Sequence, residues 1–347
     1  MSTPTDLVAD RAYCRAVLGR VSRTFALNIR LLRAHFGEAV RVGYLLCRTA
    51  DALEDSWVGS PEEIGARFDQ FLAALDGDSM AAHSLAEAAA QTAAGRPDLA
   101  LVAELPRVLR VTSALPGAHR DAVRDGVRTL ATGMRRYATR AAARSPHAPY
   151  LDTEAELDDY CWIVAGCVGV MLTDLFAAEY GVGDETRHRR RLELAPVVGR
   201  ALQLTNILLD WPADVRRGRC YLPATWLAEF GLEVPDLVGT PNAGVHALAE
   251  RLTARARGAL VQVPEYVDAI PARRVRYRLF CVWPALWALG SLRATRRTPD
   301  FPWGEARPRI SRFEVFGTAL TSALTVHSGR TLRWQWDVTA RPPVIAR

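Results

Sequence analysis

Two pairs of aspartates are the residues whose type and spacing point most clearly to chemistry. Asp51 and Asp55 lie in the segment DALED, together with Glu54, and Asp210 and Asp214 lie in DWPAD. On an α-helix, residues four apart lie about 40° apart around the axis and about 6 Å apart along it, so each pair shares one face. Like charges at this spacing cost an isolated helix about 0.2–0.5 kcal/mol. Stability therefore does not explain why the pattern occurs twice.

The sequence that precedes both pairs is apolar, with YLLC before the first and LQLTNILL before the second. Carboxylates within an otherwise buried helix need cations to offset the loss of hydration. Magnesium ions prefer oxygen ligands and often bridge carboxylates to substrate phosphates. The alternative is two solvated acidic patches, which is what such pairs usually are. The apolar surroundings favour a magnesium–phosphate site over that alternative.

Arginines occur near both aspartate pairs. They are Arg23, Arg48, Arg216, Arg217 and Arg219. Each one by itself is compatible with a plain salt bridge. Together they predict a site in which guanidinium groups bind the phosphate oxygens that the metal leaves free. All 44 basic residues are arginine, which excludes Schiff-base chemistry and a P-loop lysine.

The composition is that of an ordinary globular protein, with 347 residues, 49% of them hydrophobic, and a formal net charge of +6. No apolar stretch reaches the roughly 18–20 residues of a membrane span, and the N-terminus does not resemble a signal peptide. The six cysteines show no CxxC spacing, which favours a reducing cytoplasm. The basic clusters are short and scattered, so nucleic-acid binding is not expected.

Helical periodicity dominates the chain and predicts an all-α protein of ten or more helices. The expected segments are 10–32, 36–55, 61–76, 81–95, 98–112, 118–143, 154–180, 185–216, 241–266, 272–295 and 309–330. No Gly/Ser-rich or Pro-rich linker divides the chain. The sequence therefore predicts one domain over residues 10–335, with flexible ends at 1–9 and 336–347.

Four segments resemble the squalene/phytoene synthase family in sequence, order and separation. They are SRTF (22–25), YLLCRTADALED (44–55), YCWIVAGCVGVMLTDLF (160–176) and QLTNILLDWPADVRRGRCYLP (203–223). The second aspartate block with its GRxYLP continuation is the most specific of them. The segment FCVWP (280–284) looks more like the squalene synthase branch. The resemblance covers residues 10–330.

The resemblance implies an isoprenoid-synthase fold with a central cavity, in which two prenyl diphosphates are joined head to head. Family positions place the metal ligands at Asp51, Glu54, Asp55, Asp210 and Asp214. The substrate-binding positions are Ser22, Arg23, Phe25, Tyr44, Arg48, Gln203, Asn206, Arg219 and Phe280. Tyr160 matches the catalytic tyrosine near the proton that is lost when the cyclopropane ring closes.

The implied activity is a Mg²⁺-dependent condensation of two farnesyl diphosphates through presqualene diphosphate, giving squalene with NADPH. Two departures bear on the reaction: Leu209 stands where the family commonly has Arg, and Pro212 lies between the two aspartates, where it should bend the helix. No GxGxxG is present, which leaves NADPH use undecided. The alternatives are a dehydrosqualene, phytoene or hydroxysqualene synthase, a single-substrate terpene cyclase, and a catalytically silent scaffold protein. Peripheral contact with the inner membrane is open, since the product is a lipid.

Overall fold

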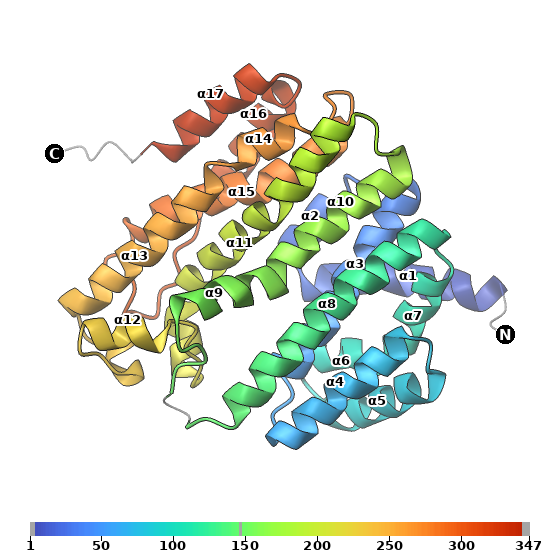
Figure 1. Ribbon diagram of the computed structural model, residues 1–347, viewed down its shortest axis with the longest axis horizontal. Coiled ribbons are helices and arrows are strands. Elements are labelled where there is room, and N and C mark those ends of the chain that lie inside the picture. The colour runs from blue at the N-terminus through green and yellow to red at the C-terminus, as the bar shows by residue number, and fades with distance from the viewer. Residues whose placement is uncertain (1–3, 146–147, 342–347) are drawn as a thin grey trace. The chain divides into compact units, whose positions relative to one another are not determined.

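Helices build both parts of the molecule, as Figure 1 shows. The computed structural model describes residues 4–145 and 148–341, without the side chains of residues 4, 5, 23 and 24. Within these ranges the only β-type pairing is an isolated bridge between Leu151 and Pro223. The prediction of an all-α protein is therefore confirmed. The helices group into two compact units, which are described separately.

Unit 1 consists of residues 1–143 and 167–183. Its helices are α1 (Pro4–Val21), α2 (Arg23–Ile29), α3 (Ala34–Asp55), α4 (Pro61–Leu75), α5 (Ser79–Thr92), α6 (Pro97–Ala103), α7 (Leu105–Ser113), α8 (Gly117–Ala142) and α10 (Cys167–Tyr180). Helix α3 packs against α8 and α6, and its fully buried residues include Phe36, Leu45 and Leu53. This packing fixes which face of α3 carries the polar residues.

Unit 2 consists of residues 144–166 and 184–347. Its helices are α9 (Glu154–Cys161), the π-helical turn η1 (Trp162–Gly166), α11 (Glu185–Arg216), α12 (Ala224–Glu229), the 3₁₀ turn η2 (Val234–Leu237), α13 (Ala243–Leu260), α14 (Val263–Asp268), α15 (Val275–Thr295), α16 (Arg312–Thr325) and α17 (Gly329–Ala340). Helix α11 packs against α13, α15 and η1.

The contact between η1 and α11 is close because Gly199 faces the turn. A Cβ atom at Gly199 would overlap the carbonyl group of Ala165 and lie 3.0 Å from Cα of Gly166. Only glycine allows this approach of the two backbones. The contact sets the position of α11 along η1.

Several predicted helices are divided in the structure. The segment 10–32 breaks at Ser22, whose hydroxyl accepts a hydrogen bond from the backbone N–H of Phe25 (3.2 Å) and begins α2. The segments 98–112 and 241–266 each form two helices, and Pro106 and Pro264 lie in the first turn of the second helix. Proline lacks the backbone donor that an uninterrupted helix needs, and it is tolerated in a first turn. The segment 309–330 contains α16 and the first residues of α17.

The two ends of the chain contain more helix than predicted, and α11 continues through its prolines. Helix covers residues 4–9 and 336–340 within the segments predicted to be flexible, whereas residues 1–3 and 342–347 lie outside the described part. The extent of a single domain stays a prediction. Helix α11 continues through Pro212 and ends at Arg216.

Two helical runs, Glu154–Tyr180 and Glu185–Arg216, are long and apolar enough to cross a membrane by length and composition alone. In their most apolar windows, 44% and 50% of the residues are buried within the structure. Core helices of soluble proteins pass the same test. The described residues therefore show no clear membrane anchor.

Candidate active site

One face of α3 brings together four of the predicted site residues. Tyr44, Arg48, Asp51 and Asp55 follow one another at intervals of four, three and four residues, so they form a stripe along the helix. The apolar side of the same helix is buried in unit 1. Glu54 lies beside the stripe and is half-buried. The sequence thus places a polar wall on a helix that its own core holds in position.

Arg48 is shared between two carboxylates. Its Nη1 donates to Oδ2 of Asp51 (3.0 Å), and its Nη2 donates to Oδ1 of Asp98 (2.8 Å). Asp98 lies in the first turn of α6 and also accepts from the hydroxyl of Ser56 (3.4 Å). Asp98 cannot be singled out from the sequence, because an acidic residue after a proline at a helix start is common and carries no functional signal.

The charge of Asp51 is incompletely compensated. Burial raises the pKa of Asp51 to about 6, and the negative charges of Asp55 and Asp98 add to the rise, although Arg48 lowers it. The side chain is nevertheless 32% exposed. Excess negative charge on a partly accessible, poorly hydrated carboxylate is a suitable environment for a cation.

The N-terminal end of this stripe is aromatic. The Tyr44 ring lies 5.3 Å from the ring of Phe25, and the Tyr44 side chain is hydrogen-bonded to Ser22. Burial raises the pKa of Tyr44. Three predicted substrate-binding residues therefore come together here. Arg23 lies in α2, and its side chain is outside the described part of the structure.

In unit 2, α11 carries a second stripe of predicted residues. Gln203, Asn206, Asp210 and Asp214 are spaced by three, four and four residues and therefore share one face. Asn206 is exposed, whereas Leu209 beside Asp210 is buried. The flanking apolar residues of α11 form the core of the unit and hold the stripe in place.

Asp210 is bound by an arginine that comes from a distant part of the chain. Arg307 places Nε 2.6 Å from Oδ1 of Asp210, and its Nη2 donates to Oδ2 (3.1 Å), so both carboxylate oxygens are engaged. The connection between α15 and α16, which carries Arg307, is tied to the end of α11: Arg216 donates to the carbonyl oxygens of Trp303 (2.8 Å) and Gly304 (3.0 Å). Burial raises the pKa of Asp210 even though Arg307 lowers it. Arg307 was not among the residues predicted from the sequence.

The end of α11 turns sharply after the second aspartate of this stripe. Gly218 adopts a φ of +78°, in the left-handed region that favours glycine, and the backbone N–H of Arg219 donates to the carbonyl of Asp214 (2.8 Å). Arg217 lies 3.9 Å from the Asp214 carboxylate. The predicted residues Asp214 and Arg219 are therefore brought together by this turn.

The predicted aromatic residues of unit 2 lie in its core. The Tyr160 ring stacks on Tyr221 at 5.2 Å, and Tyr221 in turn meets Tyr150 edge-on at 5.2 Å. Phe280 on α15 is buried and stacks on Tyr277 at 6.1 Å. Tyr221 belongs to the YLP segment, but its contact with Tyr160 was not foreseen from the sequence.

The predicted ligands suit magnesium, which completes its coordination with water and substrate, better than a metal that protein side chains alone would surround. Among residues 4–145 and 148–341, three or more His, Cys, Asp or Glu side chains nowhere converge as a ready metal-binding group. The predicted ligands in each unit offer oxygen only. Mg²⁺ typically uses one or two carboxylates and completes its coordination with water and substrate phosphates. The predicted magnesium ligands are thus compatible with the structure, and their role stays a prediction.

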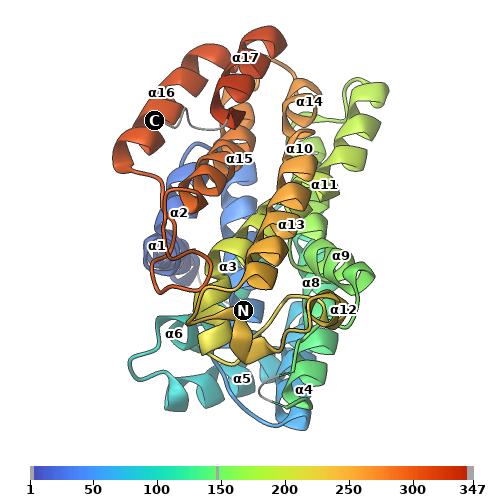
Figure 2. The ribbon, with the colours of Figure 1, turned by 90° about the vertical axis from the view of Figure 1, so that its left-hand side faces the viewer.

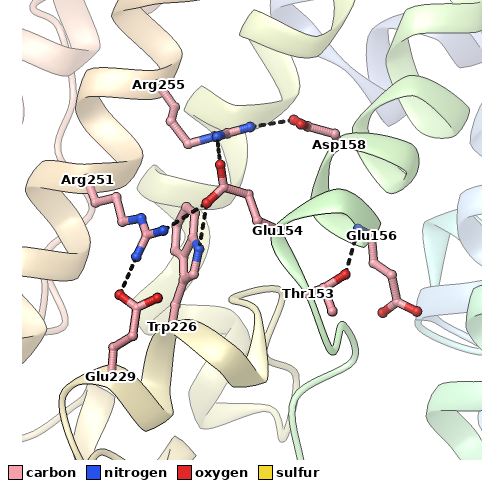
Figure 3. Close-up of polar contacts among 8 residues, drawn as sticks. All are labelled: Thr153, Glu154, Glu156, Asp158, Trp226, Glu229, Arg251 and Arg255. Carbon is pink, nitrogen blue, oxygen red and sulfur yellow. Dashed lines mark hydrogen bonds and ion pairs between the residues drawn. The ribbon is translucent and has the colours of Figure 1, made fainter.

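Another cluster of arginines and carboxylates lies in unit 2, and the pKa of its central carboxylate is lowered and not raised. Figure 3 shows Glu154, whose carboxylate contacts Arg255 and accepts from Arg251 (2.8 Å) and from the indole N–H of Trp226 (3.0 Å). Burial acts to raise the pKa of Glu154, but these contacts outweigh it, and the pKa is lowered. This cluster joins α9, α12 and α13, and both carboxylate oxygens of Glu154 are bound by arginines. Asp51 and Asp210 differ from it by their raised pKa values.

A cavity of about 880 Å³ lies elsewhere in unit 1. Its lining comes from α4, α5, α7 and α8 and includes Leu75, Leu109 and Arg124. None of the predicted site residues lines it. The central cavity that the family resemblance implies, with Tyr44 and Phe280 in its wall, therefore stays a prediction.

Comparison with known proteins gives a consistent result. The family model described as squalene/phytoene synthase matches residues 18–314. Human squalene synthase is 27% identical over 291 residues, which cover 81% of this chain and 62% of that protein. The phytoene synthase of Thermus thermophilus is 44% identical over 108 residues, 31% of this chain and 34% of that protein. The matched part thus spans less than two-thirds of the curated squalene synthases.

Solved structures share the fold. The complex of TcSQS with the ligand BPH1237 has a TM-score of 0.75 and 21% identity, covering 98% of this chain and 94% of the other. A dehydrosqualene synthase in complex with a ligand has a TM-score of 0.63 and 22% identity, covering 92% and 96%. These likenesses extend over nearly the whole chain.

Proposed function

Because this chain belongs to the squalene/phytoene synthase family, we propose that it is a prenyltransferase that condenses two prenyl diphosphates head to head. The observation that carries the proposal is the incompletely compensated carboxylate stripe of α3, where Asp51 has a pKa of about 6. A protein gains no stability from such a stripe. A cation and a diphosphate would supply the missing compensation.

The proposed substrate is farnesyl diphosphate, and the proposed product is squalene. Two molecules would first form presqualene diphosphate, which is then rearranged and reduced with NADPH as the hydride source. The match to squalene synthases along most of the chain supports this choice over a phytoene synthase. Dehydrosqualene and hydroxysqualene formation differ only in how the last cation is quenched.

Magnesium would be held by Asp51 and Asp55 in unit 1 and by Asp210 and Asp214 in unit 2, with Glu54 close to the first pair. When bound, it would neutralise the charge that develops on the departing diphosphate. The apolar faces of α3 and α11 fix each helix within its own unit and would keep its aspartates in place when the metal binds. The oxygen-only donor sets support this assignment.

Arg48 and Arg307 would exchange carboxylate partners for phosphate oxygens when the substrate binds. Each guanidinium already forms two contacts to carboxylate oxygens, and the same planar geometry suits a phosphate. We further propose that Arg307 supplies the positive charge that Leu209 lacks. Its contact with Asp210 places it beside the position where the family commonly carries an arginine.

The cation that remains after the diphosphate leaves must be kept from water. Phe25 and Tyr44 would shield it with aromatic faces at one end of the α3 stripe, where such contacts contribute about 0.5–2 kcal/mol each. Tyr160 would lie near the proton lost when the cyclopropane ring closes. Its burial and its stacking on Tyr221 hold the ring in one orientation.

The test is product analysis of the purified protein with farnesyl diphosphate and Mg²⁺, with and without NADPH. Squalene that forms only with NADPH is the expected result. Dehydrosqualene or hydroxysqualene would keep the condensation and change the product. A C15 product would replace the proposal by a terpene cyclase, and the absence of turnover would favour the scaffold protein.

The proposed location is the cytoplasm. All six cysteines are free in the structure, which supports a reducing compartment. Alkylation with iodoacetamide in denaturant as the cells are lysed, followed by mass spectrometry, would check whether the thiols are reduced in the cell.

A further inference from the structure

Helix α16 exposes a continuous row of large apolar side chains. Phe313, Phe316, Leu320 and Leu324, here called the apolar stripe, are spaced by three, four and four residues and so lie along one face. Their exposed fractions are 89%, 70%, 70% and 74%. Scattered exposed apolar residues are ordinary, but four at helical spacing form a patch of the kind that marks an interaction site.

The opposite face of α16 is polar and buried. Gln335 of α17 donates to the hydroxyl of Ser322 (2.9 Å) and to the carbonyl of Thr318 (3.2 Å), and it accepts from the hydroxyl of Thr325. Figure 2 shows α16 and α17 side by side, as these hydrogen bonds require. Helices of soluble proteins normally bury apolar residues and expose polar ones. Helix α16 instead exposes its largest apolar side chains and buries the polar side chains of Ser322 and Thr325.

The surroundings of the apolar stripe are basic. Arg309 and Arg312 stand at the start of α16, and Arg330 and Arg333 stand in the first turns of α17, all of them exposed. The acidic residues of the two helices are Glu314 and Asp337, and Glu314 is bound by Arg297 (3.2 Å). This segment therefore carries a net positive charge.

A second patch of apolar surface lies on α17, where Trp334 is 57% exposed and Val338 44% exposed. They are spaced by four residues and share a face with Arg330. Aromatic residues with nearby arginines are typical of helices that lie at a membrane–water interface.

We propose that the apolar stripe docks on the surface of a lipid bilayer that contains anionic phospholipids. Helix α16 has 14 residues and is about 21 Å long, which is too short to cross a hydrocarbon core of about 30 Å. It would lie in the plane of the interface, with the phenylalanine and leucine side chains among the acyl chains and the arginines at the headgroups. The docking is independent of the reaction proposed above.

A second copy of the chain is the competing occupant, and charge argues against it. A two-fold interface brings the same surface patch of both copies together. The arginines of this segment, of which Arg333 already pairs with Asp268 (3.5 Å), would then be brought close to those of the other copy, and like charges at an interface oppose association. Anionic headgroups instead attract them.

The experiment is flotation of the full chain with vesicles of phosphatidylcholine, either alone or mixed with phosphatidylglycerol. The protein is expected to float with the mixed vesicles, and the variant Phe313→Ser/Phe316→Ser/Leu320→Ser is expected to bind at least tenfold more weakly. The matched control is Val58→Ser/Met80→Ser, which removes two equally exposed apolar residues of unit 1. It should bind as the parent does.

Two further measurements make the outcome decisive. Circular dichroism and thermal unfolding should be unchanged in the stripe variant, because its side chains are exposed. Arg312→Gln/Arg330→Gln should weaken binding to the mixed vesicles severalfold. Failure of the parent to bind either vesicle would overturn the proposal. So would a dimer in light scattering that the stripe variant converts to monomer without any vesicle binding.

Discussion

The two aspartate stripes have the same spacing but obtain their positive charge from different places. On α3, Arg48 is three residues from Asp51 on the same helix and divides its two Nη atoms between Asp51 and Asp98. On α11, Asp210 receives both contacts of Arg307, which is 97 residues away in sequence. Negative charge from Asp55 and Asp98 raises the pKa of Asp51 on the α3 stripe, whereas Asp210 receives both contacts of one guanidinium.

This difference favours separate roles for the two stripes, which their identical aspartate spacing does not indicate. On the function proposed above, the α3 stripe would attract a cation before any diphosphate arrives, because negative charge from Asp55 and Asp98 already raises the pKa of Asp51. Asp210 would exchange one partner for another, since Arg307 would turn from the carboxylate toward a phosphate when the substrate binds. Both carboxylates still have raised pKa values, so neither is neutralised in the way that Glu154 is.

The largest expected effect tests whether both stripes are needed. Asp51→Asn and Asp210→Asn should each lower product formation by about 100–1,000-fold, because each removes a charge that stabilises the departing diphosphate. Turnover of farnesyl diphosphate measures it, and circular dichroism checks the fold. Asp121→Asn, which changes an exposed aspartate of α8, is the control. Loss in only one of the two variants would mean that a single stripe performs the chemistry.

The second prediction concerns the remote arginine. Arg307→Gln should lower turnover by about 10–100-fold, because a phosphate ligand is lost. Adding Leu209→Arg to this variant should restore part of the activity, since it returns the charge to the family position. Arg296→Gln, at an exposed arginine nearby in the chain, is the control and should behave as the parent. Full activity of Arg307→Gln would reduce the Asp210 contact to an ordinary ion pair.

Asp10 serves as a reference for the two stripes, because it is a buried aspartate whose pKa is lowered. Asp10 is buried between Arg107 and Arg110 of α7. Burial acts to raise its pKa, but hydrogen bonds and charge from the two arginines outweigh this, and the pKa is lowered. Asp10→Asn should therefore lower the free energy of unfolding by about 2 kcal/mol at neutral pH, because two arginines lose a charged partner.

The pH dependence of that effect follows from the direction of the shift. A carboxyl whose pKa is lowered on folding contributes stability above its unfolded pKa and loses it as the pH falls. Urea unfolding of Asp10→Asn and of the parent should therefore converge as the pH drops below about 4. A constant gap at all pH values would show that packing, and not charge, accounts for the loss.

The smallest expected effect is a gain in stability, opposite to the loss expected for Asp10→Asn. Asp51→Asn should raise the free energy of unfolding by about 1 kcal/mol at pH 7 to 8, because it removes a charge that burial disfavours. The pKa of Asp51 is raised from its ordinary 3.8 to about 6, so the folded state binds the proton more tightly than the unfolded state. The gain should therefore be full above pH 6 and vanish toward pH 4. Destabilisation by Asp51→Asn would contradict the excess negative charge of the α3 stripe.

The features that the sequence predicted correctly depend on residues close together in the chain. Helices, and the stripes that contain Asp51 and Asp210, follow from intervals of three and four residues. Asp98 and Arg307 could not be found this way, because their partners lie 50 and 97 residues away. Their own surroundings, a helix start and an irregular connection, are unremarkable.

Helix α16 shows a second limit of periodicity. The regular spacing of Phe313, Phe316, Leu320 and Leu324 predicts a helix over 309–330, and α16 forms within it. Periodicity states that one face is apolar but not whether that face is buried. The exposed fractions of these side chains and the hydrogen bonds of Gln335 to the other face show that the apolar face is the exposed one.

The close contact between the backbone of η1 and Gly199 also limits which substitutions α11 can accept. A side chain there would have to displace backbone, at Ala165 and Gly166, rather than a flexible neighbour. Mutational libraries that aim at new products should therefore keep this codon fixed and vary accessible positions such as Asn206, one turn before Asp210. A side chain at Gly199 would push α11 away from η1, whereas a substitution at an exposed position such as Asn206 would change only the surface of the helix.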